Sequence, residues 1–464
     1  MTFTNNIVIL QILIFFILYF LLFEMKSFTV FNFGSRARSK FIAIASLIFY
    51  AAWYPPAVLL LLFHTLLGIY GGRYIVRYRN RTVLAGVIVL ALLPLLVFKY
   101  YHFFIDLVGL EGAHLDLILP IGLSFYTFSM IGYYVDLYQK KVQYDQNFLD
   151  LLLFIAFWPH LAAGPILRAK NIFTNIFREE PLSKRTVTIA LVLIAIGLVK
   201  KLLVADNIGA YVNWNLSYGV AEMNILEAWA TMLGFSAQIY ADFSGYSDMA
   251  IGFALLMGFK LPANFNYPYR ATTVTEFWHR WHISLSTWFR DYLYFPLGGN
   301  RKGRYRTYFN IMLVFVLSGI WHGAGIGFAI WGAIHGAILV MEKIVEKSYY
   351  RLASWIRWII TMTVIVLAWS FFRLEYSDAL VMVEKMFGFH ESLFLNDVSP
   401  YYVVVILLML IFPLLDHVCR FYRVDKEGFP VVNRSLLSLL VLSLLIFAAL
   451  LFSGSPLPFI YFEF

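Results

Sequence analysis

The sequence has little charge and almost no cysteine. Charged side chains make up 14% of its 464 residues, whereas about 25% is usual in a soluble domain. The single cysteine, Cys419, excludes an intrachain disulfide framework and a zinc site built from several cysteines. The chain also lacks a G-x-S-x-G elbow and a Walker loop in a strand–turn–helix context, which argues against soluble serine hydrolases and nucleotide hydrolases.

Apolar residues are abundant instead, at 61% of the chain. A helix that crosses a bilayer needs about 20 consecutive apolar residues, and about ten such stretches are present. We therefore predict an all-α polytopic membrane protein with roughly 10–12 transmembrane or re-entrant helices. The N-terminal sequence MTFTNN lacks a basic n-region and a small-residue cleavage site, so residues 7–23 are predicted to be a retained first span rather than a signal peptide.

The net charge of +9 indicates positive cytoplasmic loops rather than nucleic-acid binding. By this rule the basic segments 36–40, 73–81, 140–141 and 301–306 lie in the cytoplasm, whereas the acidic segment 374–400 and both termini lie outside. The apolar helical segments predicted from the sequence are 7–23, 41–54, 57–72, 83–98, 117–138, 187–204, 225–241, 246–258, 308–322, 326–341, 356–372, 401–415 and 435–452.

One apolar segment, 154–170, is interrupted by Pro159 and by the pair Gly164-Pro165, and basic residues flank it on both sides. Both ends are therefore expected in the cytoplasm, and the segment is predicted to be re-entrant. Broken backbone at membrane depth is tolerated only where it is buried in protein or lines a wet cavity. This segment is thus a first indication of a cavity.

The densest polar patch lies within 275–339. Thr273 and Glu276 fit a capping box, so a helix is predicted to begin near residue 274. Along that helix two stripes recur at helical spacing. The apolar stripe is Trp278, Trp281, Leu285, Trp288 and Tyr292, and the polar stripe is His279, His282, Ser286 and Arg290. Such a helix lies at the membrane interface or lines a polar cavity.

His322 follows Arg306 of the basic loop by 16 residues, which is about 24 Å of helix. It should therefore lie well inside a hydrocarbon layer of about 30 Å, where ionisable residues usually line a substrate path or a cavity. The alternative is a neutral imidazole that hydrogen-bonds between helices, and His335 and His160 allow the same interpretation.

A neutral histidine in a dry site can take the proton from a hydroxyl that attacks an ester or thioester, and a second donor can polarise the carbonyl. A metal site can also be drawn from His279 and His282, with Asp242 and Asp248 not far off in sequence. Nothing in the sequence fixes the three or four convergent ligands that zinc or iron sites need, so no metal is predicted.

Two further segments each have two interpretations. The loop LGGNRKG (297–303) either binds the phosphates of a cytosolic donor or is a plain positive-inside loop. The C-terminal peptide SPLPFIYFEF (455–464) is too aromatic for a disordered tail. It is either an aromatic plug at the outer interface or a segment that reaches back into the cavity and presents Tyr461.

At these residues the chain resembles the membrane-bound O-acyltransferases, and within them the bacterial alginate and peptidoglycan O-acetyltransferase branch. The matching motifs are PIGLSFYTF (120–128), FWPHLAAGPILR (157–168), QIYADFSGYSDMAIG (238–252), NFNYPYR (264–270), EFWHRWHISLSTWFRDYLYFPLGG (276–299) and SGIWHGAG (318–325). The sequence EFWHRW departs from the more usual EFWRRW at His279, and no loss of function is expected from this.

The resemblance implies a single integral-membrane domain over 1–464 whose helices surround a central tunnel. The catalytic core is expected at about 115–342, and the C-terminal helices and terminal peptide at 356–464. Acetyl-CoA would be the donor, entering from the cytoplasm, and no cofactor would be bound. The acetyl group would reach an extracytoplasmic cell-envelope polysaccharide through a separate SGNH-type acetyltransferase partner, in the inner membrane of a bacterium.

The resemblance also implies site residues. His322 would be the catalytic histidine, His282 the second family histidine and Tyr461 a candidate acyl acceptor. Residues expected along the tunnel are Trp321, Asp242, Ser286, Arg290, Asp291 and His160, and those expected at the donor are Asn300, Arg301 and Lys302. The related D-alanyl transferases, which use an acyl carrier protein, and a non-catalytic acyl or glycan transporter remain alternatives, and a scaffold role could coexist with the enzyme.

Overall fold

The computed structural model describes residues 6–24, 35–109, 115, 117–176, 182–388, 422–432, 435–452 and 457–462. Helices make up nearly all of its regular structure. Within the described residues the strands are one antiparallel pair, β1 (Tyr422–Val424) and β2 (Pro430–Val432), in which Tyr422 lies opposite Val432. The predicted all-α class is confirmed.

The chain forms two compact units, which we describe separately. Unit 1 comprises Met1–Ile194 and Met249–Pro262, and unit 2 comprises Ala195–Asp248 and Ala263–Phe464. The helices that begin in unit 1 are α1 (Asn6–Tyr19), η1 (Phe20–Glu24), α2 (Ser35–Trp53), η2 (Pro55–Ala57), α3 (Val58–Tyr78), α4 (Arg81–Val108), α5 (Leu123–Tyr138), α6 (Phe148–Ala156), α7 (Trp158–Leu161), α8 (Ala169–Ile176) and α9 (Lys184–Val199).

The helices that begin in unit 2 are η3 (Lys200–Ala205), α10 (Asp206–Ser217), η4 (Val220–Glu222), α11 (Ile225–Leu256), η5 (Pro268–Arg270), α12 (Val274–Arg280), α13 (Ile283–Phe289), η6 (Arg290–Tyr294), α14 (Arg304–His322), α15 (Ile326–Tyr349), α16 (Ser354–Arg373), α17 (Tyr376–Phe387), α19 (Leu436–Phe452) and η7 (Ile460–Phe462). Two of these segments, η3 and η6, are π-helical.

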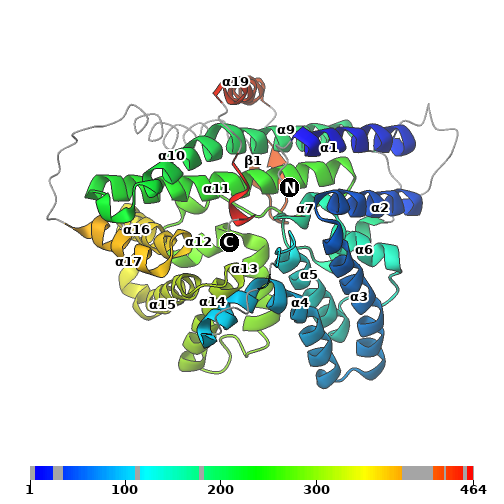
Figure 1. Cartoon of the computed structure of the whole chain (residues 1–464), viewed down its shortest axis with the longest axis horizontal. Helices are drawn as coiled ribbons and strands as arrows, with labels where there is room; N and C mark the ends of the chain where they lie inside the picture. Colours follow the sequence, from blue (N-terminus) through cyan, green and yellow to red (C-terminus); the bar gives the residue numbers. More distant parts are fainter. Residues whose placement is uncertain are drawn as a thin grey trace. The chain divides into compact units, whose positions relative to one another are not determined.

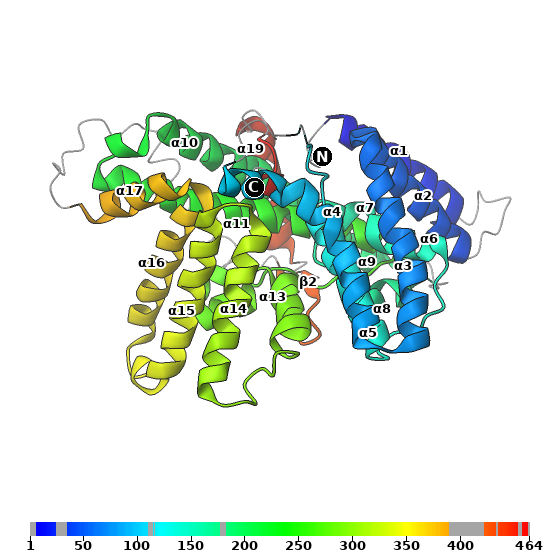
Figure 2. The same ribbon diagram turned by 60° about the horizontal axis from the view of Figure 1, so that its bottom comes forward.

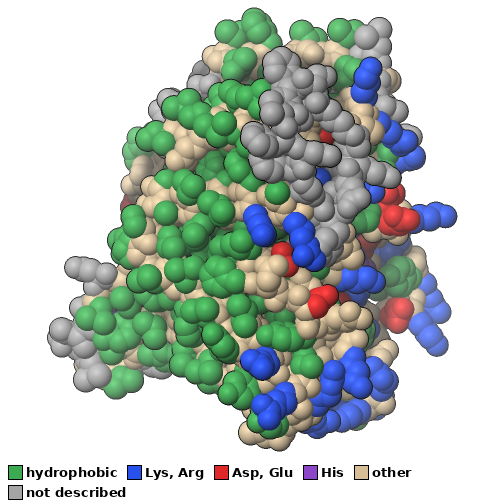
Figure 3. All heavy atoms as spheres, turned by 90° about the vertical axis from the view of Figure 1, so that its right-hand side faces the viewer, with side chains coloured by type: hydrophobic (Ala, Val, Ile, Leu, Met, Phe, Trp, Pro, Cys, Tyr) green, Lys and Arg blue, Asp and Glu red, His purple; other side chains and the backbone are tan. Residues whose placement is uncertain are grey.

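Six segments of the described chain are long and apolar enough to cross a membrane: Ile7–Glu24, Pro55–Tyr78, Arg81–Asp106, Lys184–Ser217, Ile326–Tyr349 and Ser354–Arg373. In α3 and α4 many of the exposed side chains are large and apolar, while four arginines between 73 and 81 are exposed where the two helices join. Figure 3 shows a broad apolar area bordered by Lys and Arg side chains. The protein is therefore a multi-pass membrane protein.

Two predicted interruptions of the chain are present in unit 1. Helix α2 ends before Pro55-Pro56, which begin the short helix η2, and α3 follows from Val58. The segment 157–168 is broken as predicted, because only the four residues of α7 are helical, with Pro159 at the second position. Almost all of this irregular backbone is buried in unit 1, which is how a membrane protein can tolerate it.

Two sequence predictions about element boundaries are wrong. The expected spans 225–241 and 246–258 form one helix, α11. The polar and small residues between them pack against neighbours instead of turning the chain, and a Cβ at Gly245 would lie only 2.9 Å from the Gly197 carbonyl oxygen. The expected loop 374–400 contains α17, which buries Ala379, Met382 and Met386. The predicted span 401–415 lies outside the described residues.

The predicted hairpin of 308–322 and 326–341 is confirmed as α14 and α15, which lie side by side in both ribbon views (Figures 1 and 2). Glycines let their backbones approach closely. A Cβ at Gly319 would lie 2.1 Å from the Phe328 carbonyl oxygen, and one at Gly332 would lie 2.2 Å from the Phe315 carbonyl oxygen. This packing fixes the end of α14, where His322 lies.

We expect Gly332→Ala to destabilise the protein by about 1–3 kcal/mol, because the added methyl group meets backbone that cannot move aside. Gly86→Ala in α4 is the control, since nothing lies within 4 Å of its Cβ position and alanine is the better helix former. The measurement is thermal unfolding of purified protein in detergent. Equal unfolding temperatures for Gly332→Ala and wild type would contradict the close packing.

Candidate active site

The polar patch is built on a helix that is interrupted, not continuous. Helix α12 ends at Arg280 and α13 begins at Ile283, and His282 between them has a left-handed backbone with φ 41° and ψ 54°. The prediction of one helix with a single polar stripe is therefore wrong. His279 and Arg290 are exposed, whereas His282 is fully buried.

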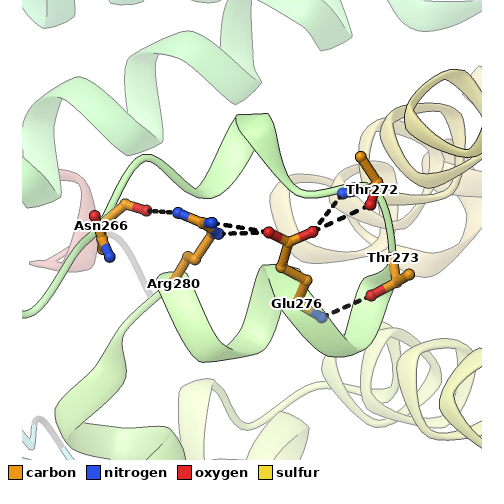
Figure 4. Close-up of polar contacts among 5 residues, drawn as sticks. All are labelled: Asn266, Thr272, Thr273, Glu276 and Arg280. Atoms are coloured by element: carbon orange, nitrogen blue, oxygen red, sulfur yellow. Dashed lines mark hydrogen bonds and ion pairs between the residues drawn. The ribbon is translucent and has the colours of Figure 1, made fainter. Parts of the chain in front are cut away.

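The start of α12 is fixed by its first turn (Figure 4). The Glu276 amide donates to the Thr273 hydroxyl oxygen over 2.9 Å, which confirms the predicted helix start. The Glu276 carboxylate does not close the capping box on Thr273. It accepts from the amide and hydroxyl of Thr272 and from Arg280, which also donates to the Asn266 carbonyl oxygen. Partial burial alone would raise the pKa of Glu276, but the hydrogen bonds from Thr272 and the contacts of Arg280 outweigh it and lower that pKa.

His282 is tied to the preceding loop by Asn264. The Asn264 backbone oxygen accepts from the Ile283 amide over 2.9 Å, and its side-chain oxygen lies 3.2 Å from His282 Nδ1. These contacts hold a residue with a side chain in a left-handed conformation that costs about 1–3 kcal/mol. Burial lowers the pKa of His282 to about 3, so the imidazole is neutral.

His322 is the last residue of α14, which runs without interruption from the basic loop as predicted. Its side chain is buried among aromatic rings, with ring centroids 4.9 Å from Trp321, 5.1 Å from Phe372 and 5.2 Å from Trp331. The chain continues into an extended Gly323, so the imidazole lies at the end of the helix.

Tyr461 lies against both histidines. Its ring centroid is 5.8 Å from that of His322, 6.5 Å from that of His282 and 4.3 Å from that of Phe243 on α11. Burial raises the pKa of its phenol, so the hydroxyl is protonated. We call His282, His322 and Tyr461 the histidine–tyrosine cluster. Of the two interpretations of the C-terminal peptide, this placement favours the one that presents Tyr461.

Two buried charged side chains hold the C-terminal peptide by its backbone. Lys201 Nζ donates to the Leu457 carbonyl oxygen over 3.0 Å, and the Asp242 carboxylate accepts from the Ile460 amide over 2.8 Å. Lys201 also pairs with Asp242 at 3.0 Å and with Asp206 at 2.8 Å. We call Lys201, Asp206 and Asp242 the tail clamp, because they fix the residues directly before Tyr461.

The other predicted site residues are distributed more widely. Trp321 and Asp242 lie beside the histidine–tyrosine cluster, Trp321 against both histidines and Asp242 on the amide next to Tyr461. The Ser286 hydroxyl donates to the Trp281 carbonyl oxygen. Arg290 is exposed and pairs with its neighbour Asp291 at 2.8 Å.

The predicted donor residues Asn300, Arg301 and Lys302 are exposed in the loop before α14. They stand at the opposite end of this 19-residue helix from His322, a separation of about 28 Å. His160 belongs to unit 1, where it is fully buried and its Nδ1 donates to the Phe157 carbonyl oxygen over 2.7 Å.

Sequence reasoning missed Asn264, Lys201, Phe243 and Phe372. Lys201 had a usable signal, because lysines inside a 34-residue apolar segment are expensive and commonly mark function. Asn264 had none beyond its place in NFNYPYR, since its contact with His282 depends on a loop. Within the described residues, no group of three or more His, Cys, Asp or Glu side chains is placed to hold a metal ion.

Comparison with known proteins agrees with the resemblance. Residues 137–377 match the model of the membrane-bound O-acyltransferase family. A Pseudomonas aeruginosa protein named probable alginate O-acetylase AlgI is 40% identical over 377 residues, covering 77% of this chain and 71% of that protein. A Helicobacter pylori peptidoglycan O-acetyltransferase is 32% identical over 91% of both chains. A Bacillus subtilis teichoic acid D-alanyltransferase is 28% identical over 61% of this chain and 74% of its own length.

The chain belongs to the membrane-bound O-acyltransferase family and is an O-acyltransferase. The predicted fold class and enzyme class are thereby confirmed. The roles of individual side chains in the histidine–tyrosine cluster stay predictions.

The tail clamp gives a prediction with an adjacent control. Lys201→Met leaves two buried carboxylates without their cation and removes the contact to Leu457, whereas Lys200→Met breaks a buried pair with Asp248 at 2.6 Å instead. Removing one partner of a buried pair costs about 3–5 kcal/mol, so both variants should lose stability.

Only Lys201→Met should also release the C-terminal peptide. The measurement is limited chymotrypsin digestion of detergent-purified protein, read as loss of C-terminal mass. Equal protection of this peptide in the two variants would show that the clamp does not hold it.

Proposed function

We propose that this O-acyltransferase takes an acetyl group from cytoplasmic acetyl-CoA and passes it across the membrane for O-acetylation of a cell-envelope polysaccharide. The relatives that support this are named for alginate and for peptidoglycan, two different polymers. Their common element is the acetyl group, so the acceptor is assigned here only as an extracytoplasmic polysaccharide.

The observation that carries the proposal is the Tyr461 ring packed against His282 and His322. In the first step the Tyr461 oxygen attacks the thioester carbonyl carbon while His322 takes the phenolic proton. The carbon–sulfur bond then breaks and the thiolate receives that proton from His322, which gives CoA-SH and an acetyl ester on Tyr461. His282 orients the Tyr461 hydroxyl before the attack.

In the second step a hydroxyl of an extracytoplasmic SGNH-type partner attacks the Tyr461 ester. The acetyl group moves to that hydroxyl, and the attacking proton returns to the Tyr461 oxygen. The partner then acetylates the polysaccharide, which explains how relatives with a shared core can serve different polymers. These reaction steps require that the protein lie in the inner membrane of a bacterium, with its C-terminal peptide accessible from outside.

The donor is expected to approach along α14. CoA carries its phosphates and its thioester at opposite ends of a long pantetheine arm. The exposed cations Arg301 and Lys302, with Asn300, stand at one end of α14, and His322 at the other. The positive-inside rule assigns this basic loop, and the arginines between α3 and α4, to the cytoplasm. On this topology both termini lie outside.

D-alanyl transfer from an acyl carrier protein is a second candidate. It is supported by the teichoic acid D-alanyltransferases among the relatives, which are 28% identical. An acidic carrier protein would bind the same exposed basic loop. The transporter alternative has less support, because the family is one of acyltransferases.

The test uses detergent-purified protein with labelled acetyl-CoA and locates covalent label by mass spectrometry. Wild type should carry label on Tyr461, and Tyr461→Phe should carry none. His322→Ala should label about 100- to 10,000-fold more slowly, the usual contribution of a general base. His335→Ala, which removes another buried histidine on α15, is the control and should stay within tenfold of wild type.

Three outcomes separate the alternatives. CoA release without label, on addition of an acceptor protein, would indicate direct transfer and exclude Tyr461 as a relay. Label from a D-alanyl carrier protein but not from acetyl-CoA would favour the second candidate. Labelling of Tyr461→Phe at another site would overturn the assigned acceptor.

A further inference from the structure

We propose that Asn264 is a positioning residue that fixes the tautomer of His282, with the proton on Nδ1 and the lone pair on Nε2. The functional importance of this tautomer rests on the function proposed above. The chemical assignment itself follows from hydrogen bonds in unit 2, and it can be measured without any activity.

The contacts of Ser284 identify which end of the Asn264 amide faces His282. The Ser284 backbone amide lies 3.2 Å from the side-chain atom of Asn264 that contacts His282 Nδ1, and the Ser284 hydroxyl lies 2.8 Å from it. A backbone N–H can only donate. This atom is therefore the amide oxygen. The opposite end, Nδ2, accordingly donates to the Ser247 hydroxyl oxygen over 3.3 Å.

The amide oxygen of Asn264 determines where the imidazole proton of His282 lies. An amide oxygen only accepts, so its partner His282 Nδ1, at 3.2 Å, must donate and therefore carries the hydrogen. In a neutral imidazole the other nitrogen, Nε2, is then an acceptor. His282 is buried, and its low pKa is consistent with the neutral form.

The Ser284 hydroxyl offers a competing arrangement. Its oxygen lies 3.5 Å from His282 Nδ1, so it could in principle donate to that nitrogen and produce the opposite tautomer. A hydroxyl has one proton, however, and the Asn264 oxygen is closer, at 2.8 Å. The shorter contact takes the proton, which leaves His282 to supply its own on Nδ1.

The tautomer of His282 determines its part in the reaction. The Nδ1 edge of the ring is occupied by Asn264, and the ring packs near Tyr461 and Trp321. Before the attack, a neutral His282 with a lone pair on Nε2 can accept a hydrogen bond from the Tyr461 hydroxyl and orient it until His322 takes the proton. His282 cannot donate to a developing oxyanion before it has itself gained a proton. Asn264 thereby determines that His282 begins the cycle as an acceptor.

Asn264 also holds the left-handed backbone of His282 through the Ile283 amide, so removal of its side chain can disturb folding. Asn264→Asp avoids this difficulty. Its carboxylate accepts the same bonds from Ser284 and His282, and loses only the donation to Ser247. Its negative charge favours the protonated imidazole and raises the His282 pKa. The reaction needs neutral His282. As the pH is lowered, Asn264→Asp should therefore lose activity at a higher pH than wild type does.

The first experiment measures the rate of Tyr461 labelling from acetyl-CoA against pH. Asn264→Asp should retain a rate within tenfold of wild type at alkaline pH, with its acidic limb moved upward by one pH unit or more. Ser247→Ala, which loses only the contact to Nδ2, and Ser284→Ala should keep the wild-type limb. An unmoved limb in Asn264→Asp, or a moved one in Ser247→Ala, would overturn the proposal.

The second experiment reads the tautomer directly. Full-length protein with 15N-labelled histidine is studied by NMR, and the His282 signals are identified by their loss in His282→Gln. Wild type should show a protonated, pyrrole-type Nδ1 and a pyridine-type Nε2, and Asn264→Leu should show a mixture or the reverse. The reverse assignment in wild type, or an unchanged one in Asn264→Leu, would refute the role of Asn264.

These two readouts also separate this proposal from the proposed function. If Tyr461 is never labelled but the NMR assignment is as expected, the relay fails and the positioning role of Asn264 stands. If labelling occurs and the assignment is reversed, the relay stands and Asn264 does not set the tautomer.

Discussion

A charge that leaves water must meet an opposite charge, and the arrangement of the site depends on this constraint. Lys201 lies within an apolar helical segment, where an unpaired ammonium would be prohibitively costly. Two carboxylates compensate it, one directly after the π-helical turn that carries it and one on α11. Lys201 and Asp242 also form hydrogen bonds with the backbone of the C-terminal peptide. The position of Tyr461 therefore depends on the same buried ion pairs that compensate Lys201 between the packed helices.

The two histidines are positioned by different means. His322 is placed by regular structure, since a long helix packed at glycines against its neighbour delivers the side chain to a fixed point. His282 is placed by irregular structure. It has a left-handed backbone between two short helices, and Asn264 of the preceding loop binds its imidazole. Packed helices thus determine where His322 lies, and local hydrogen bonds determine how His282 is oriented.

The sequence predicts the regular part well for a physical reason. Apolar runs and basic loops define helices, and counting residues along α14 places His322 at its buried end. Long-range pairing is harder to predict. Asp242 marks no turn, because its charge is compensated by Lys201, 41 residues earlier in the chain (242 − 201). The break at His282 is not predicted from the sequence either. The helical spacing of the residues around His282 continues across the break, whereas its left-handed backbone depends on contacts with Asn264 in the preceding loop.

The backbone recognition of the C-terminal peptide has a geometric consequence. Lys201 and Asp242 bind a carbonyl and an amide, groups that every residue but proline offers in full, so they do not read side chains at Leu457 and Ile460. They do fix the register. Consecutive Cα atoms are about 3.8 Å apart, and the second anchor is the residue directly before Tyr461. The two backbone anchors thus set the number of residues that lead to Tyr461, while the burial of Phe459 and Ile460 limits which side chains fit between them.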